Sequence, residues 1–206
     1  MLFKNRHPHR PLSNPNTAPQ QPLIRKLTAR SSWKDRTTGK IEVGAQFLTC
    51  AFGRAGILAQ KREGDGGTPA GRFHLLGLLY RGDRQRRFGG TIKAWRLNPQ
   101  DVWCDDPASS AYNQHARLPF GPSHEKLWRA DCKYDFIIVL DYNLFPKKKN
   151  FGSAIFLHLT GHPPEPTAGC VAISMDDMRR LMPRLSRSTV LSIQLPGYGR
   201  PRAKNR

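Results

Sequence analysis

Short runs of apolar and β-branched residues recur along most of this chain, and turn-forming residues separate them. The 206 residues include 18 glycines and 17 prolines, which leaves few stretches long enough for a regular helix. Runs of this length that end at turn signals are typical of β-strands. We therefore expect a mainly β fold, a sandwich or a partly closed barrel with one or two short helices. The expected strands cover residues 41–51, 72–80, 135–140, 154–160, 170–174 and 189–195.

Two segments carry signals for short helices. Residues 175–185 follow Ser174, which can cap the first turn, and acidic residues come next, where the helix dipole favours them. Pro183 limits the last turn of this helix. A second short helix is expected from Ser123, as its cap, through Trp128.

The run at residues 154–160 alternates in a way that separates two faces of a strand. One face is purely aliphatic and is expected to point to the core, whereas His158 falls on the less apolar face, where a cleft could form. The aliphatic face consists of Ile155, Leu157 and Leu159, and the face of His158 also carries Ala154, Phe156 and Thr160.

Cys170 follows His158 by twelve residues and opens the next expected strand. A cysteine attacks a carbonyl carbon as its thiolate, so it needs a neighbouring base, and His158 could meet it across the two strands. Gly169 would let a substrate carbonyl approach the backbone closely. The N–H groups of Ala168, Gly169 and Cys170 are then candidates to bind the oxyanion that develops.

Two other interpretations of these residues stay open. Cys170 can be a small buried hydrophobe, with His158 a hydrogen-bonded strand histidine. His158, His162 and Cys170 can also be compared with a zinc site, but Gly161 and Pro163 disfavour the helix that the histidine spacing requires. The chain has no CxxC pair to complete such a site. We expect no metal and no cofactor.

The segment KREGDGGTPAGRFHL at residues 61–75, followed by FLHL and then GCVAI, resembles the L,D-transpeptidase catalytic domain, the YkuD-type peptidoglycan enzymes. The similarity covers roughly residues 40–195. It implies a cysteine nucleophile at Cys170, which acylates on the L-centre of a diaminopimelate–D-alanine bond in a stem tetrapeptide. It also implies that His158 is the base.

The chain departs from the common family pattern around Cys170. The family usually reads Ser-His-Gly-Cys, an aliphatic residue and then Arg, whereas residues 167–172 read TAGCVA. The usual second histidine and the arginine are absent, and loss of the arginine removes a bidentate carboxylate clamp, so the identity of the acyl donor stays open. Thr167 keeps a hydroxyl where the family has serine.

Residues 101–143 resemble a divergent branch of the same family, which includes L,D-carboxypeptidases that work inside the cell. Polar and aromatic side chains gather there, and such a cluster could form a substrate wall; alternatively, the aromatic residues are satellite core and the charged ones a solvated rim. The candidates for substrate contact are Tyr112, Asn113, Glu125 and Trp128.

Three functions follow from these features. With an amine of another stem as acceptor, the enzyme cross-links or remodels peptidoglycan. With water as acceptor, it is a cytoplasmic L,D-carboxypeptidase that releases D-alanine from recycled muropeptides. The third interpretation is a non-catalytic protein that binds polyanions.

The charge of the chain is strongly positive, with 34 Lys and Arg against 15 Asp and Glu, a net +19. Such a surface attracts polyanions non-specifically. The sequence lacks the pattern of a nucleic-acid-binding module, and its aromatic residues are not interleaved with its basic runs, so we expect no specific nucleic-acid partner.

We expect one catalytic domain at residues 23–196, between a basic tail rich in Pro, Asn and Gln at residues 1–22 and a basic tail at residues 197–206. The first thirty residues contain no apolar segment of a signal peptide, and no transmembrane segment is evident. The expected location is the cytoplasm, or the cell envelope if the start of the chain is incomplete. The four cysteines form no metal or redox motif and are expected to be reduced.

Overall fold

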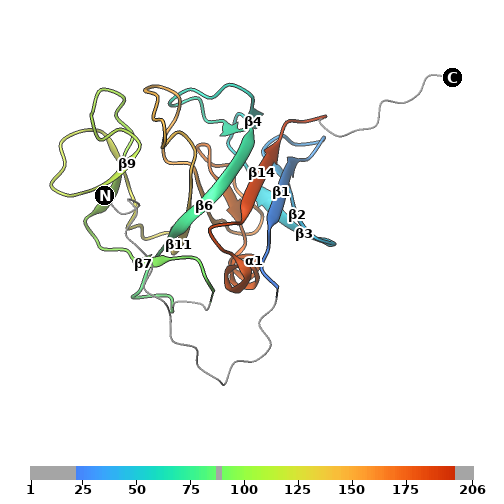
Figure 1. The fold of residues 1–206 in the computed structure, drawn as a ribbon. Coiled ribbons are helices and arrows are strands. Elements are labelled where there is room, and N and C mark those ends of the chain that lie inside the picture. Colours follow the sequence, from blue (N-terminus) through green and yellow to red (C-terminus); the bar gives the residue numbers. More distant parts are fainter. Residues whose placement is uncertain (1–21, 87–89, 198–206) are drawn as a thin grey trace.

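The computed structural model describes residues 22–86 and 90–197 and consists mainly of strands (Figure 1). Within these ranges eight strands pair in the order β11-β12-β13-β3-β2-β1-β14-β6, and β6 pairs again with β11, so the sheet closes on itself. The prediction of a mainly β fold is confirmed, in the form of a closed barrel. Its strands are β1 (Lys26–Ser31), β2 (Thr38–Val43), β3 (Gln46–Ala51), β6 (Gly71–Tyr80), β11 (Phe136–Leu140), β12 (Phe156–Leu159), β13 (Val171–Ile173) and β14 (Val190–Gln194).

The predicted single strand at residues 41–51 is in fact a hairpin of β2 and β3. Val43 pairs with Gln46, and the tight turn between them places Gly44 at φ 60°, a left-handed conformation that glycine adopts readily. β1 was not predicted, because polar residues interrupt its apolar pattern. β1 lies parallel to β14 and antiparallel to β2. It therefore connects the hairpin of β2 and β3 to β14 within the sheet.

The interior of the barrel is filled by the aliphatic side chains of alternate strand positions. Leu157 and Leu159 belong to this core, which confirms the predicted core face of β12. Helix α1 (Met175–Leu181) lies below the strands in Figure 1 and inserts Met178 and Leu181 into the same core. The helix therefore closes one end of the barrel.

The predicted start of α1 is confirmed, because the Ser174 side chain accepts a hydrogen bond from the N–H of Asp177 at 3.1 Å. The helix ends earlier than predicted. A 3-10 helix, η1 (Met182–Arg184), follows α1, with Pro183 in its first turn. A proline there lacks the N–H that would continue the α-helical ladder.

A second, smaller sheet covers part of the outer surface of the barrel. It consists of β8 (Asp101–Cys104) between β9 (Gln114–Arg117) and β10 (His124–Lys126). The predicted helix from Ser123 through Trp128 is therefore wrong: His124 pairs with Cys104 of β8, and this pairing overrides the local capping signal. Trp103 and Leu127 of this region pack on Phe156 from the outer face of β12, in a second hydrophobic cluster.

Three short strands complete the description. β4 (Ile57–Leu58) pairs with β5 (Thr68–Pro69), and β7 (Ala94–Arg96) lies parallel to β6 outside the closed ring. The two predicted tails lie outside the described residues, apart from Pro22 and Gly197. In the described part of the chain, no helix has the length and apolar character needed to span a membrane.

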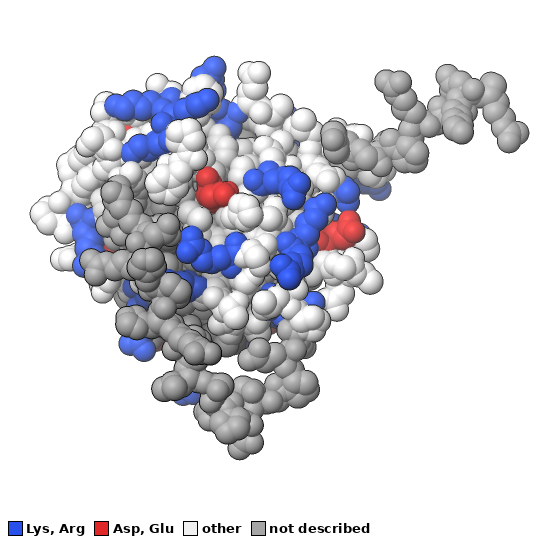
Figure 2. Space-filling model, in the orientation of Figure 1, with Lys and Arg blue, Asp and Glu red and all other residues white. Residues whose placement is uncertain are grey.

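The positive charge is visible on the surface. Figure 2 shows Lys and Arg side chains spread over the visible face, with far fewer acidic ones. Figure 2 shows no single basic stripe on this face, so the excess charge is distributed rather than concentrated there.

Candidate active site

Cys170 and His158 lie on the same face of two adjacent strands. β12 and β13 run parallel, with Leu157 opposite Val171 and His158 opposite Ala172. Cys170 directly precedes β13 and shares the face of Ala172, because side chains alternate along a strand. The candidate nucleophile and base are thus diagonal neighbours on the outer face of the barrel.

The sulfur of Cys170 is held by backbone groups of the segment that leads into β12. Its Sγ donates to the carbonyl oxygen of Ala154 at 3.1 Å and accepts from the N–H of Phe156 at 3.3 Å. The residue is 6% exposed. Burial raises the pKa of the thiol and Glu125 raises it further, while the Phe156 N–H, Lys61 and Tyr134 act in the opposite direction. The resting sulfur is therefore a thiol at neutral pH.

The ring of His158 is fixed as one tautomer. Its Nδ1 lies 2.8 Å from the carbonyl oxygen of Leu159, which can only accept, so Nδ1 carries the proton and Nε2 keeps a free lone pair. Burial lowers the pKa of His158 to about 4, so the ring is neutral at pH 7. A neutral imidazole with a free Nε2 is the form that can accept a proton.

The face of His158 is covered, although we expected a cleft there. His158 is 5% exposed, and the ring of Tyr134 lies edge-on to it with 5.0 Å between the ring centroids. Among the described residues no hydrogen bond links the Cys170 sulfur to the His158 ring. The second hydrophobic cluster accounts for this burial, because Tyr134, Phe156 and Cys170 all belong to it.

Tyr134 is a site residue that the sequence did not reveal. Its hydroxyl donates to the Glu125 carboxylate, and its proximity lowers the pKa of the Cys170 thiol. Burial raises the pKa of both Tyr134 and Glu125, although the bond from Tyr134 opposes the rise at Glu125. The tyrosine thus connects the predicted residue Glu125 of β10 with both the thiol and the imidazole. No motif marks Tyr134, which lies just before β11.

The turn before Cys170 is held by the hydroxyl of Thr167. Thr167 Oγ1 donates to the Cys170 carbonyl oxygen at 2.7 Å and accepts from the Gly169 N–H at 3.1 Å. Gly169 has φ 149°, and a Cβ there would lie 2.8 Å from the carbonyl oxygen of Gly67, so only glycine fits. Because the Gly169 N–H is bonded within the turn, Ala168 and Cys170 supply the remaining candidate donors for an oxyanion.

The segment at residues 61–69 packs against this turn. Asp65 accepts hydrogen bonds from Lys61 Nζ at 2.6 Å, from the Arg62 N–H at 2.6 Å and from the Gly67 N–H at 2.8 Å. The Thr68 hydroxyl then donates to the Cys170 carbonyl oxygen at 3.3 Å. The carboxylate of Asp65 therefore organises the loop that supports the candidate nucleophile, and its partner Lys61 is 4% exposed in its side chain.

The other predicted site residues occupy different surroundings. Asn113 is buried, and its Oδ1 accepts from Trp103 Nε1 at 2.9 Å and from the Ala154 N–H at 3.1 Å. Asn113 therefore holds Ala154, whose carbonyl oxygen accepts the hydrogen bond from the Cys170 thiol. Tyr112 is also buried and donates to Glu63, while Trp128 is half-buried beneath the guanidinium of Arg81, which lies 3.6 Å from the ring centroid.

Two further observations concern the other cysteines and a possible metal site. All four cysteines are free, and Cys132 is exposed while Cys50, Cys104 and Cys170 are buried. In the described part of the chain, no group of three or more His, Cys, Asp or Glu side chains is placed to hold a metal ion.

The family model of the L,D-transpeptidase catalytic domain, YkuD, matches residues 26–193, and the chain belongs to this family. Among solved structures, Mycobacterium tuberculosis L,D-transpeptidase 1 is 10% identical, with a TM-score of 0.36, and the match covers 82% of this chain and 61% of that one. An L,D-transpeptidase from Mycobacterium smegmatis is 10% identical, with a TM-score of 0.38 and coverage of 82% and 58%. The chain spans about three fifths of the length of these two structures. No curated protein matches the chain.

Proposed function

We propose that this protein is a cysteine acyltransferase that cross-links or remodels peptidoglycan through tetrapeptide stems. Membership of the L,D-transpeptidase catalytic domain family supports this reaction class. The observation that supports the assignment to residues is that Cys170 lies diagonally from a neutral His158, with Nε2 unprotonated, on one face of two adjacent strands. This arrangement provides a nucleophile and a base together.

The reaction proceeds in two acyl transfers. His158 Nε2 takes the Sγ proton as the sulfur attacks the carbonyl carbon of the third stem residue, which forms a tetrahedral oxyanion. The C–N bond to D-alanine then breaks, and the imidazolium returns its proton to the departing amine. A thioester on Cys170 remains, and an acceptor attacks it, which regenerates the thiol.

The environment of the pair determines when the thiolate forms. Burial raises the pKa of Cys170 and lowers that of His158, so both groups rest in their neutral forms. We infer that the proton moves only as the sulfur attacks, and that no ion pair accumulates in the free enzyme. Lys61 and Tyr134 lower the pKa of the thiol and so favour this step.

The acceptor distinguishes two activities. An amine of a second stem gives a cross-link, and water gives an L,D-carboxypeptidase. The second activity is our alternative candidate, because residues 167–172 lack the usual histidine and arginine of the family pattern, and the orientation of the acyl donor depends on such groups. The same thioester forms on Cys170 with either acceptor.

The test is to incubate the purified protein with a disaccharide-tetrapeptide and to follow the products by mass spectrometry. A joined dimer identifies the transpeptidase, and loss of one alanine identifies the carboxypeptidase. Cys170→Ala and His158→Ala should abolish both products while the melting temperature stays close to that of the parent. Turnover that persists in the Cys170→Ala protein would refute the assignment, and unchanged substrate with the parent protein would favour the polyanion-binding alternative.

A further inference from the structure

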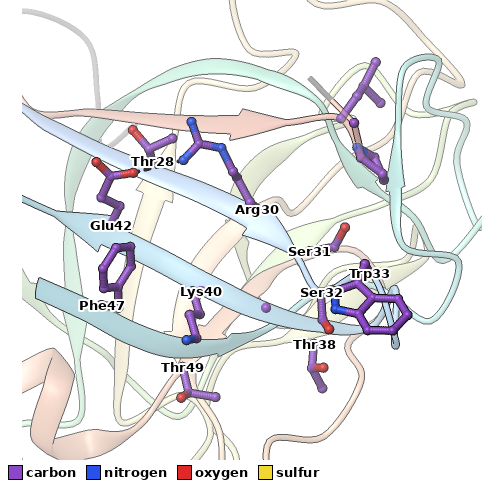
Figure 3. A pocket seen from close by; sticks show the side chains of 14 residues that line it. Thr28, Arg30, Ser31, Ser32, Trp33, Thr38, Lys40, Glu42, Phe47 and Thr49 are labelled. Atoms are coloured by element: carbon purple, nitrogen blue, oxygen red, sulfur yellow. Dashed lines mark hydrogen bonds and ion pairs between the residues drawn. The ribbon is translucent and has the colours of Figure 1, made fainter. Parts of the chain in front are cut away.

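A groove of about 830 Å³ lies on the outer surface of the barrel, over β1, β2 and β3 (Figure 3). Figure 3 shows Trp33 at one end of the groove and Phe47 at the other, with polar side chains between them. These rings are 80% and 63% exposed, whereas most large apolar side chains of the protein are buried. Two exposed aromatic rings at the ends of one groove are typical of a binding surface.

The groups between the rings suit a ligand that has both apolar faces and hydroxyl groups. Lys34 Nζ lies 5.2 Å from the centroid of Trp33, and Lys40 Nζ lies 5.7 Å from that of Phe47, so a cation accompanies each ring. Arg30 and Glu42 form an ion pair of 2.9 Å towards the Phe47 end of the groove and offer both donors and acceptors. The hydroxyl groups of Thr28, Ser31, Ser32, Thr38 and Thr49 also line it.

We propose that this groove binds the amino-sugar glycan chain that carries the stem peptides. A pyranose ring presents an apolar face, which stacks on an aromatic ring, and an edge of hydroxyls, which bond to side chains such as Thr49 and Glu42. Lys34 and Lys40, which lie beside the two rings, can donate to hydroxyl and carbonyl oxygens of such a sugar. This inference rests on the proposed function and extends it from the stem to the polymer.

The register of the sheet connects the groove to the candidate nucleophile. Thr38 of the groove pairs with Ala51, Ala51 with Ala172, and Ala172 with His158, so the four residues form one row on the outer face. Three strand spacings separate Thr38 from His158, which is roughly 14 Å. Ala51 and Ala172 are fully buried, so the path passes over the residues that cover them.

The length of a stem peptide fits this separation. Three extended residues between the sugar and the scissile bond span up to about 11 Å, and the link from the peptide to the sugar supplies the remainder. A glycan seated near Trp33 would therefore place the third stem residue close to Cys170. The distance favours the Trp33 end, because Phe47 pairs with Glu42, four residues and roughly 13 Å further along the strand.

Single-stranded nucleic acid is the competing occupant, since it too uses aromatic rings and cations. The binding test below distinguishes the two occupants.

The binding test uses full-length Cys170→Ala protein, which cannot turn over a stem, and soluble glycan strands stripped of their peptides. Trp33→Ala and Phe47→Ala should each raise the Kd by roughly ten-fold, which corresponds to a loss of about 1.4 kcal/mol in binding free energy. Phe145→Ala is the matched control, because this ring is 69% exposed but does not line the groove. Equal affinities in all four proteins would overturn the proposal. Tighter binding of a thymidine oligonucleotide that depends on Trp33 and Phe47 would also overturn it.

A turnover test separates this proposal from the proposed function. In proteins that keep Cys170, Trp33→Ala should lower kcat/KM for stems attached to glycan by roughly ten-fold and leave that for a free tetrapeptide unchanged. An equal loss on both substrates would count against the glycan site. If no protein turns over any substrate while the glycan still binds at Trp33, the proposed function fails and the glycan site stands.

Discussion

The ion pair between Lys61 and Asp65 gives the sharpest test of how the loop at residues 61–69 is held beside the candidate site. We predict that Asp65→Ala destabilises the protein much more than the double variant Lys61→Met/Asp65→Ala does. The aspartate is the 2.6 Å partner of a lysine whose side chain is only 4% exposed. Its removal leaves an ammonium group without its counter-charge in a poorly solvated place.

The magnitude follows from the burial of the two partners. Loss of one partner of a buried pair costs about 3–5 kcal/mol, and we take the lower end because Asp65 is 20% exposed. In the double variant no buried charge remains, and the cost falls to about 1–2 kcal/mol for the hydrogen bonds from Arg62 and Gly67 that are still lost. With about 3 kcal/mol for Asp65→Ala and about 1–2 kcal/mol for the double variant, the expected coupling is roughly 1–2 kcal/mol plus the cost of the single Lys61→Met variant.

The effect also has a defined pH dependence. Burial alone would raise the pKa of Asp65, but the bonds from Arg62, Lys61 and Gly67 outweigh it and hold the pKa below its ordinary value. A carboxyl group with a lowered folded-state pKa contributes stability above its unfolded pKa and loses it as the pH falls through the folded value. The difference between parent and Asp65→Ala should be constant from about pH 5 upward and shrink below about pH 3.9.

Urea unfolding followed by tryptophan fluorescence would measure these quantities in the parent, the two single variants and the double variant. If the two single costs add to the double within about 0.5 kcal/mol, the two residues are independent and the argument fails. A cost for Asp65→Ala that does not change between pH 7 and pH 3 would refute the pH dependence.

Three further results are expected. Ser174→Ala removes the side-chain cap of α1 and should cost about 1 kcal/mol, which lowers the Tm by about 2–4 °C in a calorimetric scan; an unchanged Tm would contradict the role of the cap. Tyr134→Phe keeps the ring beside His158 but removes the hydroxyl that donates to Glu125 and lowers the pKa of Cys170, so kcat/KM should fall while the Tm changes little. The pH profile of kcat/KM should lose activity near pH 4, where His158 becomes protonated, and an acid limb near pH 6.5 would exclude this buried base.

Local patterns in the sequence predicted the parts of the fold that depend on local chemistry. Alternation defined the core face of β12 because the period of a strand is two, and Ser174 marked the start of α1 because a cap acts within one turn. The hairpin of β2 and β3 was missed because the apolar pattern continues through Gly44. The segment after Ser123 carries a helix signal, but it pairs with β8, and no local pattern encodes a partner twenty residues away.

The same distinction applies to the candidate site. The positions of Cys170 and His158 followed from a motif, because the two residues lie on consecutive strands joined by one loop. Tyr134 and Lys61 are near the sulfur only because β11 pairs with β12 and the loop at residues 61–69 folds back onto the turn at Gly169. Such proximity depends on the order of strands in the closed sheet. The burial of His158 was likewise not predicted, since the small sheet that accompanies it was not recognised.

The place of β14 between β1 and β6 determines when this fold can exist during synthesis. Among the described residues β14 is the last strand, yet it pairs with the first strand, β1, and with the longest, β6, so both carry unpaired backbone groups until residue 194 is available. Exposed edges of this kind are templates for aggregation. Folding that waits for contacts between the two ends of a domain is intrinsically slow. A nascent or truncated chain that stops before β14 would therefore be a substrate for chaperones and proteases rather than a partly functional protein.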